Sequence, residues 1–143
     1  MGRRSRRDAD ESRLVILVDT SAWVEFLRDT GSRVCQRVDE LLDEAIAVCD
    51  PVRMEVFAGA RDEAHLTRLR GLLARASIVP IGPTHYEQAA AMYRTCRRNG
   101  ETVRRLIDCV IAAAAIDAGI PLLHADADFD ALARHTDLRI ADG

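Results

Sequence analysis

Five acidic residues are the strongest candidates for chemistry in this sequence. They are Asp19, Glu55, Asp108, Asp126 and Asp128. Asp108 lies within the most apolar predicted helix, where a charge is costly unless something positive meets it. Carboxylates that share one pocket repel one another and raise each other's pKa values, and a divalent cation relieves that repulsion. We therefore predict that these residues form a cation site.

The ligand types restrict the cation. The set contains only carboxylates, with no cysteine and no spaced pair of histidines. Oxygen ligands of this kind favour a hard ion, Mg²⁺ or Mn²⁺, rather than zinc. Such ions keep several waters and leave positions for phosphate oxygens and an attacking hydroxide. The pattern therefore predicts hydrolysis of a phosphodiester.

Two predicted strands place the first two acids. Residues 14–18 form an uninterrupted apolar run, which is typical of a strand buried on both faces of a parallel sheet, and Asp19 follows its carboxyl end. Ligand sites in open α/β sheets lie beyond the carboxyl ends of strands. Glu55 lies one turn inside a helix that begins at Asp50-Pro51, directly after a short strand at 45–49.

The remaining pattern alternates strands with helices, which predicts an α/β fold with a central parallel sheet of four to five strands covered on both sides. Asp126 and Asp128 follow the last main strand, so four acidic positions converge on one rim. We expect Thr20 or Ser21 to cap the first helix. This first helix is expected at 22–28. Besides the helix that begins at Asp50, the other expected helices span 32–44, 64–74, 84–98, 102–118 and 129–134. The other strands are expected at 77–81 and 120–124, with a possible edge strand at 138–140.

Length and composition fit one domain of 14–143, preceded by a disordered basic and polar extension at 1–13. The net charge is −3, and all 20 basic residues are arginines. The four cysteines lie far apart and are expected to be buried and reduced. No apolar stretch reaches membrane-spanning length and residues 1–13 lack the core of a signal peptide, so we expect a cytoplasmic protein.

Other functions remain to be weighed. Asp19 could simply cap the next helix. A response-regulator receiver requires a lysine, which this chain lacks, and a haloacid-dehalogenase phosphatase requires a second aspartate two residues after the first, where this chain has Ser21. A non-catalytic domain that only binds RNA or a protein partner is the alternative from a different class. The intact acids argue against it.

Four motifs in this order resemble those of PIN domains and, more narrowly, of the VapC ribonuclease toxins of bacterial toxin–antitoxin pairs. The resemblance extends over residues 14–140. The motifs are Val18-Asp19-Thr20-Ser21, Glu55 within 51–55, Leu106-Ile107-Asp108, and 124–129 with its two aspartates.

This resemblance implies a PIN-like α/β/α sandwich and an endoribonuclease that depends on Mg²⁺ or Mn²⁺. It also implies a homodimer, a cognate VapB-type antitoxin that covers the site, and a structured RNA substrate such as tRNA or rRNA. Asp19 and Asp108 match direct metal ligands, and Glu55 and Asp126 match residues that complete the cluster, with Asp128 beside them. Thr20 or Ser21 matches a hydroxyl that supports the first acid. His124 departs from the family, which more often has a small hydroxyl residue there.

Arginines near the 99–100 turn are candidate RNA contacts. Arg97, Arg98, Arg104 and Arg105 could bind phosphates, because local charge matters more than net charge. The alternative is an ion pair between Arg104 and Asp108, one helical turn apart, with the others on a solvated face. Few aromatic residues are present, which favours RNA read by shape and backbone. The remaining side chains of interest are expected to be surface, packing or interface residues: His65, His85, His135, Trp23 and Met92.

Overall fold

A four-stranded parallel sheet lies at the centre of the computed structural model, which describes residues 15–142. The predicted extension at 1–13 lies outside the described residues. The strand order is β3-β2-β1-β4. Its strands are β1 (Ile16–Val18), β2 (Ile46–Val48), β3 (Ser77–Ile78) and β4 (Leu122–Leu123). The predicted parallel α/β architecture is confirmed.

The strands are shorter than the apolar runs that predict them. After β3, the Val79 N–H still donates to the Val48 carbonyl at 2.9 Å, but Pro80 has no N–H to continue the ladder. At the other edge, the predicted strand at 138–140 is reduced to a single parallel bridge between Ile140 and Leu122.

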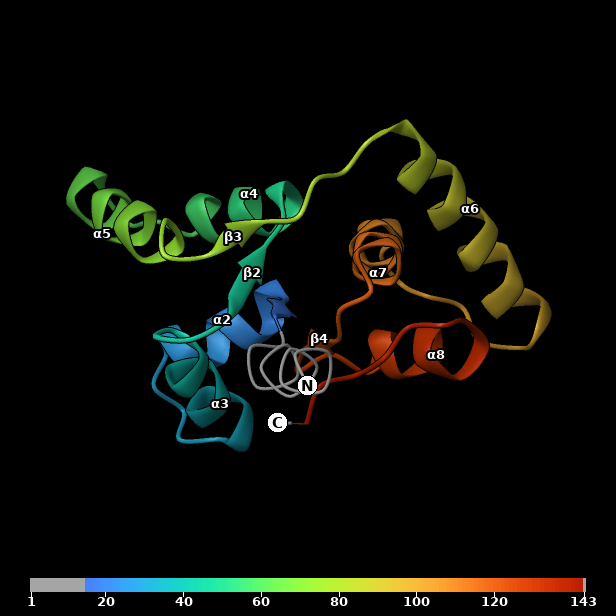
Figure 1. Cartoon of the computed structure of the whole chain (residues 1–143), viewed down its shortest axis with the longest axis horizontal. Helices are drawn as coiled ribbons and strands as arrows, with labels where there is room; N and C mark the ends of the chain where they lie inside the picture. The colour runs from blue at the N-terminus through green and yellow to red at the C-terminus, as the bar shows by residue number, and fades with distance from the viewer. Residues whose placement is uncertain (1–14, 143) are drawn as a thin grey trace, which may run out of the picture.

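Helices pack on both sides of the sheet (Figure 1). The helices α6, α7 and α8 gather toward one end of the longest axis, and α2, α3, α4 and α5 lie toward the other. The bounds are α2 (Thr20–Leu27), α3 (Arg33–Leu41), α4 (Asp50–Ala58), α5 (Glu63–Leu73), α6 (Pro83–Arg98), α7 (Leu106–Ala118) and α8 (Ala127–His135). None of the described helices is long and apolar enough to cross a membrane.

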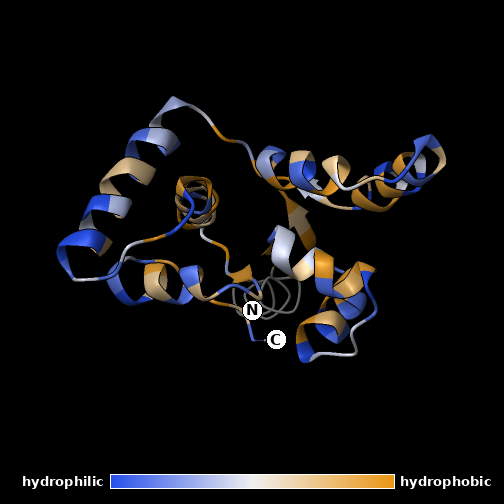
Figure 2. Cartoon of the chain, turned by 180° about the vertical axis from the view of Figure 1, so that it is seen from behind, coloured by the Kyte–Doolittle hydropathy of each residue, from blue (hydrophilic) through white to orange (hydrophobic). Residues whose placement is uncertain are grey.

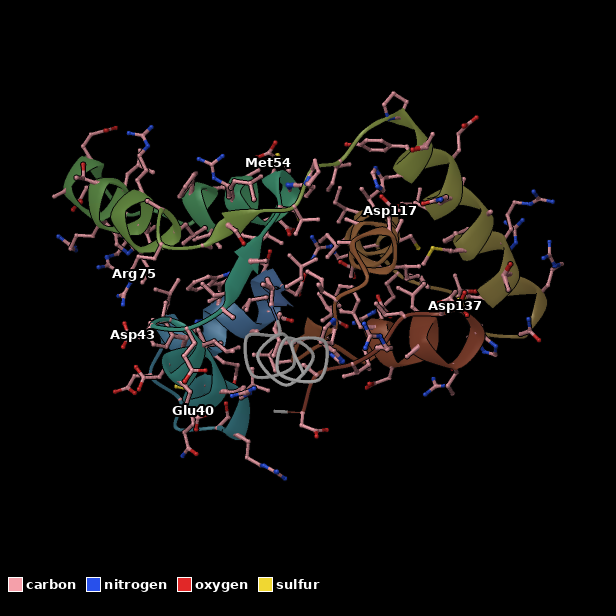
Figure 3. The ribbon with its side chains drawn as sticks, viewed as in Figure 1. Glu40, Asp43, Met54, Arg75, Asp117 and Asp137 are labelled. Atoms are coloured by element: carbon pink, nitrogen blue, oxygen red, sulfur yellow. The ribbon has the colours of Figure 1, made fainter. Side chains whose placement is uncertain are left out.

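The helix α7 is apolar along most of its length (Figure 2) and is buried from Asp108 to Ala115. Gly119 ends it in the left-handed conformation at φ 69°, as expected for a helix C-terminus. Trp23 and Phe129 are fully buried in the same core. An ion pair between Asp43 and Arg75 joins the segments that follow α3 and α5 (Figure 3).

All four cysteines are free and buried, as predicted. Burial raises the pKa of the Cys49 thiol and that of the Cys109 thiol, each to about 12. Both side chains are therefore protonated near neutral pH and behave as small apolar residues.

Two local predictions are wrong. The first helix is capped by Asp19 and not by Thr20 or Ser21, because Asp19 has extended backbone angles and Thr20 is already helical. The helix predicted at 102–118 begins only at Leu106. The Arg104 N–H donates to Asp128 Oδ2 at 3.1 Å, a tertiary bond that holds the preceding segment outside the helix.

Candidate functional site

Asp19 lies at the carboxyl end of β1 with only 4% of its surface exposed. Its Oδ2 accepts bonds from the Ser21 N–H at 2.9 Å and the Ser21 hydroxyl at 2.7 Å. Its Oδ1 is buried and has no partner among the described residues. Asp19 therefore caps α2 with one oxygen, while its other oxygen has no partner within residues 15–142.

Asp108 lies in the first turn of α7 and is 1% exposed. Its Oδ2 also lacks a partner within the described part of the chain. Burial, reinforced by the negative charge of Asp19, raises the pKa of Asp108 to about 7, against the lowering effect of Arg105. Burial also raises the pKa of Asp19, and the charge of Asp126 adds to this. Both carboxyls therefore bind a proton more readily than an exposed aspartate does.

Asp126 and Asp128 enter the same pocket from the start of α8. Asp126 caps this helix, and its Oδ1 accepts the Asp128 N–H at 3.0 Å. One carboxylate oxygen each from Asp108, Asp126 and Asp128 lie within 4.8 Å of one another. A single cation at their centre could take a ligand from each, with Asp19 beside it.

Glu55 lies outside this group of three carboxylates. Its Oε1 accepts the Thr20 hydroxyl at 2.7 Å, and its other oxygen pairs with Arg105. Thr20 follows Asp19 directly, so Glu55 stands on the α4 side of the pocket. The structure thus brings Asp108, Asp126 and Asp128 together, with Asp19 adjacent and Glu55 engaged at the rim.

Arginines neutralise part of the pocket in a way that the sequence pattern missed. Arg104 Nη2 donates to Asp126 Oδ1 at 3.0 Å, and its Nε lies 3.4 Å from both oxygens of Asp128. The expected ion pair between Arg104 and Asp108 is wrong, because Arg104 precedes α7 and points at the α8 carboxylates. Arg105 pairs with Glu55.

The other two candidate RNA contacts lie on α6. Arg97 stacks over the ring of Tyr93 at 5.6 Å, and Arg98 donates to the Thr95 hydroxyl at 3.2 Å. Neither forms an ion pair with a carboxylate of the described residues. Of the four arginines predicted near the turn, two therefore pair with carboxylates of the site, and the other two lie on α6.

His124 supports the loop that carries Asp126. Its Nδ1 accepts the Asp126 N–H at 3.0 Å, and its ring lies 5.3 Å from that of Phe129. A hydroxyl also supports this loop, but it comes from Ser21 and not from position 124. The Ser21 Oγ accepts the Ala125 N–H at 2.9 Å. Only the position of His124 directly after β4 could have pointed to this role.

The donor set fits a hard divalent cation. It offers carboxylate oxygens alone, two of them buried and without a partner among residues 15–142. A buried, unpaired carboxylate oxygen is costly, and Mg²⁺ or Mn²⁺ would compensate that cost.

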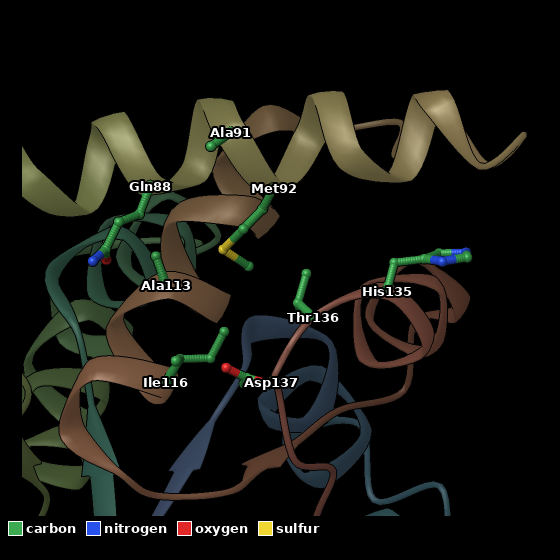
Figure 4. Close-up of a pocket in the computed structure, with 8 residues that line it drawn as sticks. All are labelled: Gln88, Ala91, Met92, Ala113, Ile116, His135, Thr136 and Asp137. Atoms are coloured by element: carbon green, nitrogen blue, oxygen red, sulfur yellow. The ribbon is translucent and has the colours of Figure 1, made fainter.

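A separate cavity of about 390 Å³ lies between α6, α7 and the end of α8 (Figure 4). Asp137 is the only carboxylate that lines it, so it offers no comparable group of cation ligands. The expectation that Met92 is a packing or interface residue fits its place in this lining.

Comparisons with known proteins identify the family. A model of the PIN domain matches residues 16–135. Ribonuclease VapC11 from Mycobacterium tuberculosis is 46% identical over 131 residues, which cover 89% of this chain and 98% of that protein. Ribonuclease VapC51 from the same species is 30% identical over 123 residues, which cover 86% of this chain and 88% of that protein.

Solved structures show the same fold at low identity. VapBC2 from Rickettsia felis, bound to a DNA fragment from its promoter, aligns with a TM-score of 0.73 at 17% identity, covering 91% of this chain and 99% of that one. DNA-bound VapBC from Salmonella typhimurium aligns with a TM-score of 0.72 at 19% identity, covering 90% of this chain and 98% of that one. Because the PIN-domain model matches most of its length and VapC11 is 46% identical to it, this chain belongs to the PIN-domain family and, within it, to the VapC ribonucleases.

Proposed function

We propose that this chain is a Mg²⁺- or Mn²⁺-dependent endoribonuclease, the toxin of a VapBC pair, which hydrolyses phosphodiester bonds in structured RNA such as tRNA or rRNA. One observation carries the proposal. Oxygens of Asp108, Asp126 and Asp128 lie within 4.8 Å of one another, beside the unpartnered Oδ1 of Asp19. Arg104 pairs with two of these carboxylates, whereas the buried oxygens of Asp19 and Asp108 lack a partner among the described residues, and a cation would supply one.

The residues of the site have different proposed roles. Asp19, Asp108, Asp126 and Asp128 would hold the ion through their carboxylate oxygens. When bound there, such an ion would supply Lewis-acid activation of a phosphate oxygen and would lower the pKa of water. Ser21 fixes the rotamer of Asp19 with two hydrogen bonds. Thr20 holds Glu55 at the rim, where a carboxylate can orient a water through a hydrogen bond.

Cleavage by antitoxin-free protein tests the proposal. Wild type should cut a pool of cellular RNAs in Mn²⁺ or Mg²⁺, and chelation with EDTA should abolish cutting. Asp19→Asn and Asp108→Asn should each lower the rate by at least about a hundredfold, since each removes a charged ligand. Asp117→Asn is the matched control, because Asp117 lies on the same helix and pairs with His85 instead.

Two results would contradict the proposal. Undiminished cleavage by Asp108→Asn would place the active site elsewhere. A wild-type protein that binds RNA but never cuts it in either ion would favour the non-catalytic alternative. Sequencing the RNA ends produced after induction in cells would identify the substrate.

The proposal extends to two partners. The VapBC structures from Rickettsia felis and Salmonella typhimurium contain toxin with antitoxin, which supports a cognate VapB for this chain. A VapB encoded beside it should co-purify with it and suppress RNA cleavage. We also propose a homodimer, which light scattering of the purified chain would test.

A further inference from the structure

A groove with a cationic wall lies beside the acidic pocket, between α2, α4 and α5. It has a volume of about 440 Å³. Aliphatic side chains, among them Val24, Val56 and Leu69, form part of its lining. Arg28, Arg61 and Arg68 contribute exposed guanidinium groups, and His65 contributes its imidazole. Among the described residues, no aromatic side chain lines it apart from that imidazole.

The groove reaches the residues next to Asp19. Thr20 and Glu55 line it, and they are the pair that borders Asp19 on the α4 side. Glu55 is the only carboxylate that residues 15–142 contribute to its lining, and both Glu55 oxygens already accept bonds, one from Thr20 and one from Arg105. A strand held at the aspartates can therefore continue directly into the groove.

The arginines of the groove are available for a ligand. Arg28, Arg61 and Arg68 form no ion pair within the part of the chain that the structure describes. Asp62 caps α5, and its Oδ1 accepts the His65 N–H at 2.7 Å. This backbone bond, with help from Arg68 and Arg61, holds the pKa of Asp62 below its usual value.

His65 is held in one orientation. Its Nδ1 accepts the Arg61 N–H at 3.0 Å, so a neutral ring carries its proton on Nε2. That N–H is a donor at the groove, alongside the three guanidinium groups. In a chain with a net charge of −3, four donors on one wall form a local anion-binding surface.

We propose that this groove binds the sugar–phosphate backbone of the RNA strand next to the scissile bond. Arg28, Arg61 and Arg68 contact successive phosphates, His65 Nε2 donates to one of them, and the aliphatic lining receives ribose and base. Stacking contributes little, since the lining offers no phenyl, phenol or indole ring, so the contact is tolerant of base identity. The inference depends on the proposed ribonuclease function and adds the route of its substrate.

An acidic peptide is the competing occupant. The observations favour RNA. The groove leads to the aspartates that would hold a cation, and the proposed reaction requires an RNA phosphate at that cation, not a carboxylate of an acidic peptide. The residues involved also differ from Arg97 and Arg98, the arginines on α6 that the sequence pattern indicated.

The experiment compares two triple variants with the same change of charge. The groove variant is Arg28→Gln, Arg61→Gln and Arg68→Gln. The control is Arg33→Gln, Arg70→Gln and Arg94→Gln, three exposed arginines that do not line the groove. Binding of a fluorescent single-stranded RNA is measured in EDTA over a series of salt concentrations, and cleavage kinetics are measured in Mn²⁺. Circular dichroism checks that each variant is folded.

The groove variant should lose affinity for the RNA by about tenfold or more. The slope of its log affinity against log salt concentration should become shallower by about two, since each lost phosphate contact removes about 0.7 from that slope for single strands. Its KM for RNA should rise with kcat nearly unchanged, because the contacts lie away from the cleaved bond. The control should change affinity by less than about twofold.

Three results would overturn the inference. Equal losses in both triple variants would indicate a general charge effect. Unchanged RNA affinity and KM in the groove variant would remove the groove from the substrate path. Loss of binding to an acidic VapB peptide, with RNA binding intact, would make it a peptide site. In each case wild-type cleavage would leave the ribonuclease function standing, whereas a wild type that neither binds nor cuts RNA would end both proposals.

Discussion

The hydroxyl of Ser21 accepts a hydrogen bond from the backbone N–H of Ala125 at 2.9 Å, across 104 positions of sequence. The same hydroxyl donates to Asp19 Oδ2 at 2.7 Å. It thereby joins the carboxyl end of β1 to the loop after β4, where Asp126 begins α8. One small side chain therefore sets the spacing between two of the acidic segments.

Ser21→Ala should weaken cation binding more than it weakens the fold. Losing the bridge should lower the free energy of unfolding by about 0.5–1.5 kcal/mol, and Asp19 should be held less firmly, because only the Ser21 N–H still donates to its Oδ2. Urea unfolding and calorimetric titration with Mn²⁺ measure the two effects. Ser32→Ala is the matched control, since Ser32 caps α3 and should cost about 1 kcal/mol without altering Mn²⁺ affinity. Equal Mn²⁺ affinity in both variants would contradict the role assigned to Ser21.

The buried Asp108 should make the cation-free protein less stable as pH rises. Burial and the charge of Asp19 raise the pKa of Asp108 from 3.8 to about 7. Between these values the folded state holds a proton that the unfolded state has released, so the free energy of unfolding falls with increasing pH and levels off above about 7. Asp108→Asn should make this fall shallower and stabilise the protein near pH 8, with Asp117→Asn as control.

Added Mn²⁺ should reverse the trend, because the ion binds the ionised carboxylates and only in the folded state. Its stabilising effect in urea unfolding should therefore be larger near pH 8 than near pH 6. A stability that stays flat over this range in wild type, without cation, would show that Asp108 is ionised throughout.

Much of the architecture was predictable because it depends on local patterns. The apolar run before Asp19 predicted β1, and the acid follows that strand as expected. Pro51 in the first turn of α4 correctly positioned Glu55 inside a helix. The continuous apolar character of α7 predicted a buried helix and therefore a costly Asp108.

The polar contacts between distant segments could not be predicted in the same way. The segment before α7 has no hydrophobic period, so nothing in the sequence showed that Arg104 leaves the helix to reach Asp126 and Asp128. The bond from Ala125 to Ser21 depends on the parallel register of β1 and β4, which emerges only after the sheet has formed. Periodicity identified the elements that carry the acids, whereas tertiary contacts decided which arginines meet them.

Arg104 should compete with the cation. Its guanidinium donates to Asp126 and lies against Asp128, oxygens that an ion would also use. Arg104→Gln should therefore strengthen Mn²⁺ binding, by about twofold to fivefold for an exposed ion pair, and the difference should shrink at high salt. Calorimetric titration measures this, with Arg134→Gln as control because Arg134 pairs with Glu101 instead. Weaker Mn²⁺ binding by Arg104→Gln would show that the guanidinium orients the carboxylates rather than blocking them.

His85 should matter for stability and not for chemistry. It is buried at the start of α6, where Nδ1 accepts the Gly82 N–H at 2.8 Å and Nε2 lies 3.0 Å from Asp117 Oδ2. His85→Ala should lower the free energy of unfolding by about 1–3 kcal/mol through the lost bonds and packing. Asp117→Asn should cost less, because the Asp117 side chain is 63% exposed and the bond to Gly82 remains. Mn²⁺ affinity and RNA cleavage by His85→Ala, measured well below its unfolding temperature, should equal those of wild type, since His85 belongs to neither the acidic pocket nor the groove. A slower cleavage by this variant, with folding intact, would mean that the packing of α6 against α7 positions Asp108.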